Sequence, residues 1–141
     1  MIIGDHPYRL DNKGRLTLPR KFRPYLGEVV IVTRGLDKCL WVFPKPKWEE
    51  VVAKLDALPL SSRDARRARR WIIGSAHELE PDRAGRILIP PTLREYAGIK
   101  QEVIVAGLHT YLEIWAAEAW QEEMEKVAEN EIVQDSWNTN F

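Results

Sequence analysis

The chain has 141 residues, in which 21 Lys and Arg residues balance 21 Asp and Glu residues and 45% of the residues are hydrophobic. This length and composition suffice for one compact domain or for two small domains that share a core. The single cysteine, Cys39, excludes an intramolecular disulfide and suits a reducing cytoplasm, and its apolar neighbours predict a buried thiol. The sequence shows neither an apolar run of the ~20 residues that span a bilayer nor the segments of a signal peptide, so we expect neither.

The first part of the chain predicts a succession of short strands with one short helix. A strand at 8–11 leads through a tight turn to a strand at 15–18, whose apolar and polar residues alternate between two faces. A proline then begins a short helix over 19–26. Two further strands, at 29–33 and 40–43, flank a Gly-Leu-Asp-Lys turn.

The next two segments predict helices. Apolar residues recur with helical spacing after Pro44, and we expect Trp48 to anchor this helix in the core. Ser61 or Ser62 is expected to cap a second helix, which connects the two halves of the chain. Four arginines share one arc of this second helix: Arg63, Arg66, Arg67 and Arg70. They can meet phosphates or the glutamates of the acidic second half, and the ready supply of glutamates favours the second reading.

An internal repeat decides how the chain is organised. The segment DNKGRLTLP at 11–19 returns 71 residues later as DRAGRILIP at 82–90, and Trp120 repeats Trp48. The second copy is therefore expected to fold like the first. Its expected elements are strands at 78–82, 86–89, 102–106 and 112–115 and a helix from about Ala116.

The repeat divides the chain into four parts. These are a first repeat at 5–58, a connecting amphipathic basic helix at 59–75, a second repeat at 76–128 and a C-terminal tail at 129–141. The first 75 residues contain 16 Lys and Arg against 8 Asp and Glu, whereas the rest of the chain contains 5 against 13, so the formal charges are +8 and −8. This asymmetry indicates either a polyanionic partner for the basic half or head-to-tail packing between copies of the chain.

Each repeat contains an Asp-x-x-Gly-Arg motif at a turn between two strands. The glycine permits the bend, and the aspartate can accept hydrogen bonds from turn amides or pair with the guanidinium. The arginine then leaves its strand on the face opposite the apolar residues. A guanidinium fork held in this way matches phosphate oxygens and the guanine edge. The residues alone equally permit a purely structural Asp–Arg turn whose charge keeps the loop soluble.

The two motifs, together with Gly4, the segment Pro19-Arg-Lys-Phe-Arg23 and the segment Leu112-Glu-Ile-Trp115, resemble the MraZ family of the AbrB-like superfamily. The resemblance covers nearly all of residues 1–125. It implies an α+β fold, namely a swapped-hairpin AbrB-like β-barrel formed by two tandem repeats, with flanking helices. It also implies a cytoplasmic, nucleoid-associated transcriptional regulator. Such a regulator binds short direct repeats in double-stranded DNA at the promoter of the bacterial division and cell-wall gene cluster, as a closed ring of eight or twelve copies.

Carried over to this sequence, the resemblance assigns roles to both motifs. The motif arginines Arg15 and Arg86 become the main DNA-contact candidates. Basic neighbours of the motifs become supporting contacts: Lys13, Arg20, Lys21, Arg23 and Arg83. The remaining motif residues are structural: Asp11, Gly14, Pro19, Asp82, Gly85 and Pro90. The second copy has Ala84 and Pro91 where the first has Lys13 and Arg20, so we expect the first loop to be the main DNA reader.

Other classes of function fit the sequence less well. The three histidines show no metal-ligand spacing, and no nucleophile motif accompanies the paired Asp and Arg residues. We therefore predict no catalytic residues, metal, cofactor or small-molecule substrate. The alternative is an antitoxin-like protein-interaction module of the same superfamily, which would hold its partner through the helical end at 116–141.

Overall fold

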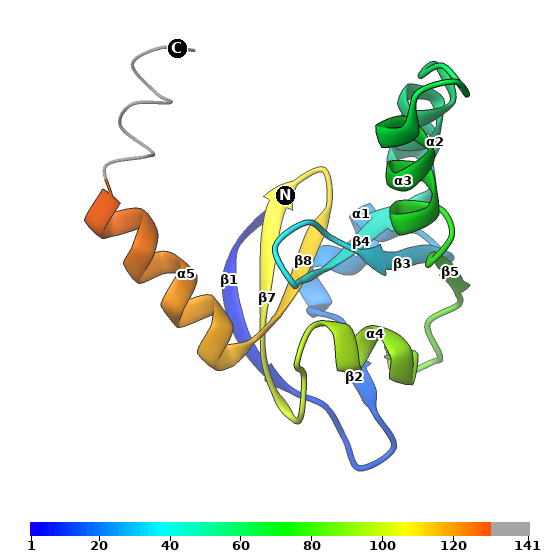
Figure 1. Ribbon diagram of the computed structural model, residues 1–141. Helices are drawn as coiled ribbons and strands as arrows, with labels where there is room; N and C mark the ends of the chain where they lie inside the picture. Colours follow the sequence, from blue (N-terminus) through cyan, green and yellow to red (C-terminus); the bar gives the residue numbers. More distant parts are fainter. Residues whose placement is uncertain (131–141) are drawn as a thin grey trace.

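The computed structural model describes residues 1–130, which form a mixed α+β fold with two antiparallel sheets (Figure 1). The first copy contains β1 (Ile2–Arg9), β2 (Arg15–Thr17), the 3-10 helix η1 (Arg20–Phe22), α1 (Arg23–Leu26), β3 (Val30–Arg34), β4 (Leu40–Pro44) and α2 (Lys45–Asp56). The helix α3 (Arg63–Ile72) connects the copies. The second copy contains β5 (His77–Leu79), β6 (Arg86–Leu88), α4 (Pro91–Tyr96), β7 (Glu102–His109), β8 (Leu112–Ala116) and α5 (Ala117–Asn130). Most of the expected tail at 129–141 lies outside the described residues.

The strands of the two copies are interleaved. The larger sheet has the order β1-β7-β8-β4-β3-β5, and each neighbouring pair is antiparallel. The first strand of each copy therefore pairs with the third strand of the other copy, β1 with β7 and β5 with β3. The smaller sheet is a ribbon of β2 and β6, again one strand from each copy. Because β1, β2, β5 and β6 all find their partners in the other copy, the two copies form one folding unit.

The register of the strands relates the copies by an approximate two-fold axis. In the ribbon, Leu16 lies opposite Ile87, which is its equivalent in the repeat. In the β4–β8 pair, Trp41 lies opposite Glu113, which again occupies the equivalent position. Equivalent residues face one another in this way when a two-fold axis crosses an antiparallel pair. The duplicated sequence thus builds within one chain an arrangement that two identical chains build in a symmetric dimer.

One hydrophobic core contains residues from both copies. Leu16, Leu18 and Phe22 from the first copy and Ile87 and Ile89 from the second are each at most 2% exposed and belong to the same cluster. Burial of one such side chain contributes about 1.5–3 kcal/mol. Neither copy can therefore reach its folded stability alone, because each supplies only part of the cluster.

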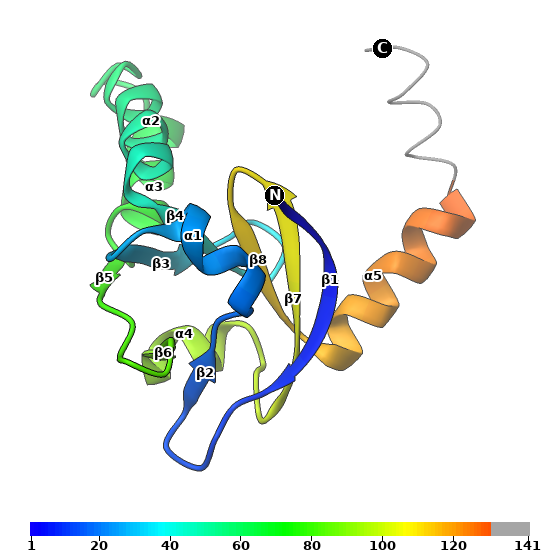
Figure 2. The ribbon, with the colours of Figure 1, turned by 180° about the vertical axis from the view of Figure 1, so that it is seen from behind.

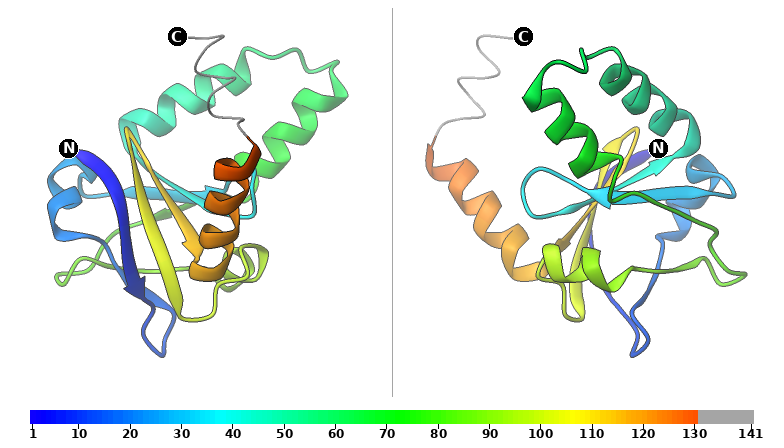
Figure 3. Two further views of the ribbon diagram at one scale, coloured as in Figure 1. Left: turned by 90° about the vertical axis from the view of Figure 1, so that its left-hand side faces the viewer. Right: turned by 45° about the vertical axis from the view of Figure 1, so that its right-hand side comes forward.

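The longer helices lie on opposite sides of the sheet. The helices α2 and α3 pack against each other as a hairpin that stands away from the sheet, whereas α5 projects from the other side (Figures 1 and 2). Figure 3 shows the hairpin and α5 from two further directions. The expected N-cap is confirmed at Ser62, whose Oγ accepts a hydrogen bond from the backbone N–H of Ala65 at 3.2 Å. Within residues 1–130, no helix combines the length and the apolar character needed to cross a bilayer.

The predicted tryptophan anchors are only partly buried. Trp48 of α2 contacts Phe43 with 5.8 Å between the ring centroids, and Trp120 of α5 contacts Trp115 at 5.7 Å. Both helices therefore attach to the sheet through aromatic pairs near their N-terminal ends.

The strand boundaries differ most from prediction in β1. The strand was expected at 8–11 but spans Ile2–Arg9, because eight of its residues pair with β7. Similarly, β7 continues to His109 rather than ending at 106. Pro7 obscures the strand in the sequence, since proline lacks a ladder donor, but β1 is an edge strand and tolerates it.

Candidate functional site

The first loop, residues 11–15, is held by the carboxylate of Asp11. One of its oxygens, Oδ1, accepts hydrogen bonds from the backbone N–H groups of Lys13 and Arg15, both at 2.9 Å. The other, Oδ2, accepts a hydrogen bond from Nε of Arg15 at 2.6 Å. Gly14 turns the backbone with a φ of +81°, which side-chain-bearing residues rarely adopt. Three donors on one carboxylate thus hold both the turn and the arginine.

The second loop, residues 82–86, repeats this geometry closely. Asp82 accepts hydrogen bonds from the backbone N–H groups of Ala84 and Arg86, both at 2.9 Å, and from Nε of Arg86 at 2.8 Å. Gly85 has a φ of +77°. The sequence left open whether the aspartate accepts from turn amides or pairs with the guanidinium, and in both copies it does both.

These contacts keep the two aspartates ionised. The pKa values of Asp11 and Asp82 lie below the usual range, chiefly because a backbone N–H of the motif arginine donates to each carboxylate. Partial desolvation opposes this lowering of the pKa, while the guanidinium adds to it. In each loop the ionised aspartate therefore holds the guanidinium of the motif arginine, and it does so through Nε only.

The motif arginines share the outward face of the β2–β6 ribbon. Arg15 lies opposite Leu88 and Thr17 lies opposite Arg86, so these four side chains point to one face while Leu16 and its partner fill the core. The two arginines are diagonal neighbours, for which a separation of roughly 7–8 Å is typical. Their side chains are 30% and 35% exposed. Among residues 1–130, their Nη atoms have no hydrogen-bond partner, so these donors remain available to a ligand.

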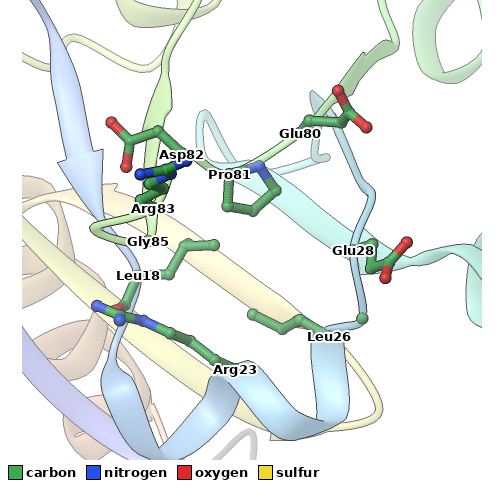
Figure 4. A pocket seen from close by; sticks show the side chains of 10 residues that line it. Leu18, Arg23, Leu26, Glu28, Glu80, Pro81, Asp82, Arg83 and Gly85 are labelled. Atoms are coloured by element: carbon green, nitrogen blue, oxygen red, sulfur yellow. The ribbon is translucent and has the colours of Figure 1, made fainter.

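Interleaving places a basic residue of each copy against the loop of the other. Arg23 extends from α1 beneath the second loop, where its guanidinium packs on Gly85 and donates from Nε and Nη2 to the carbonyl of Leu18, each at 3.1 Å (Figure 4). By the same relation, the guanidinium of Arg94 packs on Gly14 of the first loop. A Cβ atom at either glycine would overlap these guanidinium groups, which would then have to shift.

The position of Arg23 corrects the expected distribution of charge. Sequence proximity suggested that Arg23 supports the first loop, but it lies at the second, because the chain leaving β2 passes the loop of the other copy. The ladder continues beyond β2 with a hydrogen bond from the N–H of Leu18 to the carbonyl of Gly85 at 2.9 Å, and η1 follows directly. The second loop is therefore not poorer in nearby cations than the first.

The other predicted residues occupy the surroundings of the ribbon. Four predicted supporting contacts are exposed: Lys13, Arg20, Lys21 and Arg83. The two motif prolines are buried or partly buried, and Pro19 precedes η1 while Pro90 precedes α4. Sequence reasoning did not single out Thr17 and Leu88 as surface residues of the site. The alternation of apolar and polar residues could have identified Thr17 as a surface residue. Leu88 is apolar, and its 53% exposure follows only from the position of the ribbon at the protein surface.

Beside the second loop lies a depression of about 440 Å³, with Arg23 and Arg83 among its lining residues together with Glu28, Glu80 and Asp82 (Figure 4). Opposite charges line it, so it favours no ion of one sign. Within residues 1–130, no three His, Cys, Asp or Glu side chains gather as metal ligands do. Cys39 is fully buried, and burial raises the pKa of its thiol far above the usual range, as expected for a structural thiol.

Comparison with known proteins places this chain among close relatives. The sequence model of the family described as "MraZ protein, putative antitoxin-like" matches it twice, over residues 1–71 and 72–139. A protein of Caldicellulosiruptor saccharolyticus named transcriptional regulator MraZ is 50% identical over 124 residues, covering 88% of this chain and 87% of that protein. A protein of the same name from a Roseiflexus species is 44% identical over 121 residues, covering 86% of this chain and 85% of that protein. Another, from Herpetosiphon aurantiacus, is 41% identical over 129 residues, covering 92% of this chain and 90% of that protein. These names describe regulators rather than enzymes, in agreement with the sequence prediction.

Proposed function

Because the chain belongs to the MraZ family, we propose that it is a DNA-binding transcriptional regulator whose reading element is the β2–β6 ribbon. The observation that carries this proposal is the pair of arginines, Arg15 and Arg86, on one outward face of the ribbon. Each is oriented by its own aspartate and keeps its terminal nitrogens available. A two-stranded ribbon has the width that the DNA major groove admits, and arginine forks match the O6 and N7 atoms of guanine.

The cations around the ribbon supply contacts that position it. Lys13 and Arg83 extend from the two loops, and Arg20 and Lys21 lie on η1, which follows β2 directly. Exposed Lys and Arg side chains in such places bind phosphates without reading sequence, which sets the register of a protein on the duplex. Arg23 combines this role with packing on the second loop.

The finer proposal follows the resemblance of the sequence. The regulator acts in the bacterial cytoplasm and nucleoid, at the promoter of the division and cell-wall gene cluster, where it binds short direct repeats. Its two repeats form the swapped-hairpin β-barrel of the AbrB-like proteins, which the pairing of β1 with β7 and of β5 with β3 supports. Eight or twelve copies form a closed ring. One ribbon binds weakly, and several ribbons on adjacent repeats bind tightly through avidity.

Binding to the DNA upstream of the protein's own gene tests this function. Fluorescence anisotropy would compare that duplex with a shuffled duplex of the same length at several salt concentrations. We expect specific binding whose affinity falls steeply as the salt concentration rises. The decimal logarithm of the binding constant should fall by about 0.9 per neutralised phosphate for each tenfold rise in salt. Equal binding to both duplexes would exclude the ribbon as a sequence reader, whereas an affinity that salt does not change would exclude binding led by phosphate contacts.

The alternative of an antitoxin-like protein-interaction module makes a different prediction. A protein of that kind would hold its partner through the helical end, and substitutions in the ribbon would leave partner binding intact. Loss of specific DNA binding on changing the ribbon arginines therefore separates the two functions.

A further inference from the structure

The depression beside the second loop combines an apolar floor with a charged rim. Its floor contains Leu18 and Leu26, which are 1% and 2% exposed, and the partly buried Pro81. Charged residues of both signs form the rim: Arg23, Arg83, Glu28, Glu80 and Asp82. Its volume of about 440 Å³ lies within the range of sites that bind small molecules.

The corresponding place in the first copy is filled. Leu10 is the repeat equivalent of Pro81, but it is 2% exposed and its N–H donates a hydrogen bond to the carbonyl of Gln101 at 2.9 Å. Pro81 has no N–H to donate. Arg9 still belongs to β1, whereas its equivalent Glu80 follows the end of β5. The depression is therefore a property of the second copy and not of the repeated fold.

The charges of the rim lie on two sides of the depression. Figure 4 shows Arg23 and Arg83 on one side and Glu28 on the other, with the apolar floor between them. Glu80 lies on the side of Glu28 (Figure 4). Asp82 lies with the arginines, but its carboxylate already accepts three hydrogen bonds within the loop. A ligand in the depression therefore meets positive charge at one end and negative charge at the other.

The charged groups that face the depression are available to a ligand. Arg23 donates from Nε and Nη2 to the carbonyl of Leu18, which leaves its Nη1 without a hydrogen-bond partner among the described residues. Arg83, Glu28 and Glu80 are exposed, and none of them forms an ion pair within residues 1–130. A ligand can therefore bind these groups without breaking a contact that holds the fold.

We propose that the depression binds an extended zwitterion with an apolar middle, namely a short peptide of two or three residues. The carboxylate of the peptide lies between Arg23 and Arg83, because guanidinium groups match carboxylate geometry. Its ammonium group lies at Glu28 and Glu80, and its apolar side chain covers the floor. A ligand with charge of one sign would be repelled at one end. A free amino acid carries its two charges too close together to reach both sides.

The bound peptide competes with DNA, and this consequence rests on the proposed function. Arg23 packs on Gly85 of the second loop, and Arg23 and Arg83 are both proposed phosphate contacts. A carboxylate held between them neutralises the charge that DNA would use. When two ligands exclude each other, the apparent affinity for one falls by the factor one plus the ratio of the other's concentration to its dissociation constant. The depression is thus a regulatory site for the ribbon.

Calorimetric titration of the full chain without DNA tests the binding site itself. The probe is the tripeptide alanyl-leucyl-alanine, for which we expect a dissociation constant on the order of 0.1 mM. Its N-acetylated form lacks the ammonium group and its C-amidated form lacks the carboxylate, so each should bind about 10-fold more weakly. No binding of the free peptide at millimolar concentration, or equal binding of all three forms, would overturn the proposal.

Glutamine variants assign the ammonium end of the peptide. Glu28→Gln/Glu80→Gln should bind the free peptide about 10-fold more weakly than the wild type and should no longer distinguish it from the acetylated form. The matched control is Glu95→Gln/Glu122→Gln, which neutralises two exposed glutamates outside the depression and should bind like the wild type. A double variant at the rim that still prefers the free peptide, or a control that loses this preference, would refute the assigned orientation.

Fluorescence anisotropy with a duplex that contains one binding site tests the regulation. The free peptide at about ten times its dissociation constant should lower the DNA affinity of the wild type about 10-fold. Glu28→Gln/Glu80→Gln should bind DNA at least as tightly as the wild type, since it loses only negative charge, but should respond little to the peptide. Peptide binding that leaves the DNA affinity unchanged would refute the competition. A chain that binds the peptide but no DNA would instead refute the proposed function and leave the peptide site standing.

Discussion

Replacing the two motif arginines one at a time tests how the ribbon divides DNA binding between the repeats. Each arginine donates Nε to its own aspartate and keeps its Nη atoms available, so the variants Arg15→Ala and Arg86→Ala remove equivalent donors. A good bidentate contact to a base contributes about 1–3 kcal/mol, which corresponds to roughly 5- to 150-fold in affinity for one ribbon. Sequence reasoning gave the larger share to Arg15, whereas the position of Arg23 at the second loop leads us to expect similar losses from both.

Fluorescence anisotropy with a duplex that contains one binding site measures these losses without avidity. Lys54→Ala serves as control, because Lys54 is an exposed cation on α2, away from the ribbon. The Arg15→Ala/Arg86→Ala double variant should bind specific and shuffled DNA alike while keeping the wild-type oligomeric mass. If Arg86→Ala binds like the wild type while Arg15→Ala loses specificity, the expectation that both arginines contribute similarly to DNA recognition is wrong. Wild-type affinity in both variants would refute the ribbon altogether.

The remaining predictions address the loops, the core and the exposed face. The lowered pKa values of Asp11 and Asp82 mean that their carboxylates stabilise the fold above about pH 4 and lose this effect as pH falls through the lowered folded-state pKa values. The melting temperature of Asp11→Asn/Asp82→Asn should therefore lie below that of the wild type at pH 7, and a difference that persists unchanged at pH 2 would contradict this. Leu16→Ala, at a fully buried position of the ribbon, should lower the free energy of unfolding by about 2–5 kcal/mol in urea titrations; a loss under 1 kcal/mol would show that the two copies are not packed together there. Leu88 can contact a thymine methyl group, so replacing thymine with uracil should weaken wild-type binding but not that of Leu88→Ser, and equal effects on both proteins would exclude this contact.

The sequence predicted well the features that depend on residues close together in the chain. The Asp-x-x-Gly-Arg motif joins a carboxylate to donors two and four residues later, so its geometry follows from residue types and spacing. The N-cap at Ser62 similarly needs only an amide three residues later, and the buried state of Cys39 follows from its apolar neighbours. The internal repeat also indicated that the two halves fold alike, because similar sequences have similar preferences for local secondary structure.

The partners of the strands and the neighbours of the loops required the tertiary structure. Two similar copies offer each strand nearly equivalent partners in its own half and in the other, and local patterns do not distinguish them. The structure pairs β1 with β7 and β5 with β3, and this exchange moves Arg23 to the second loop and Arg94 to the first. It also places Arg15 and Arg86 on one face, although 71 positions separate them in the chain. The chain by itself therefore determined the two loops, whereas long-range packing of one shared core determined which loop each cation serves.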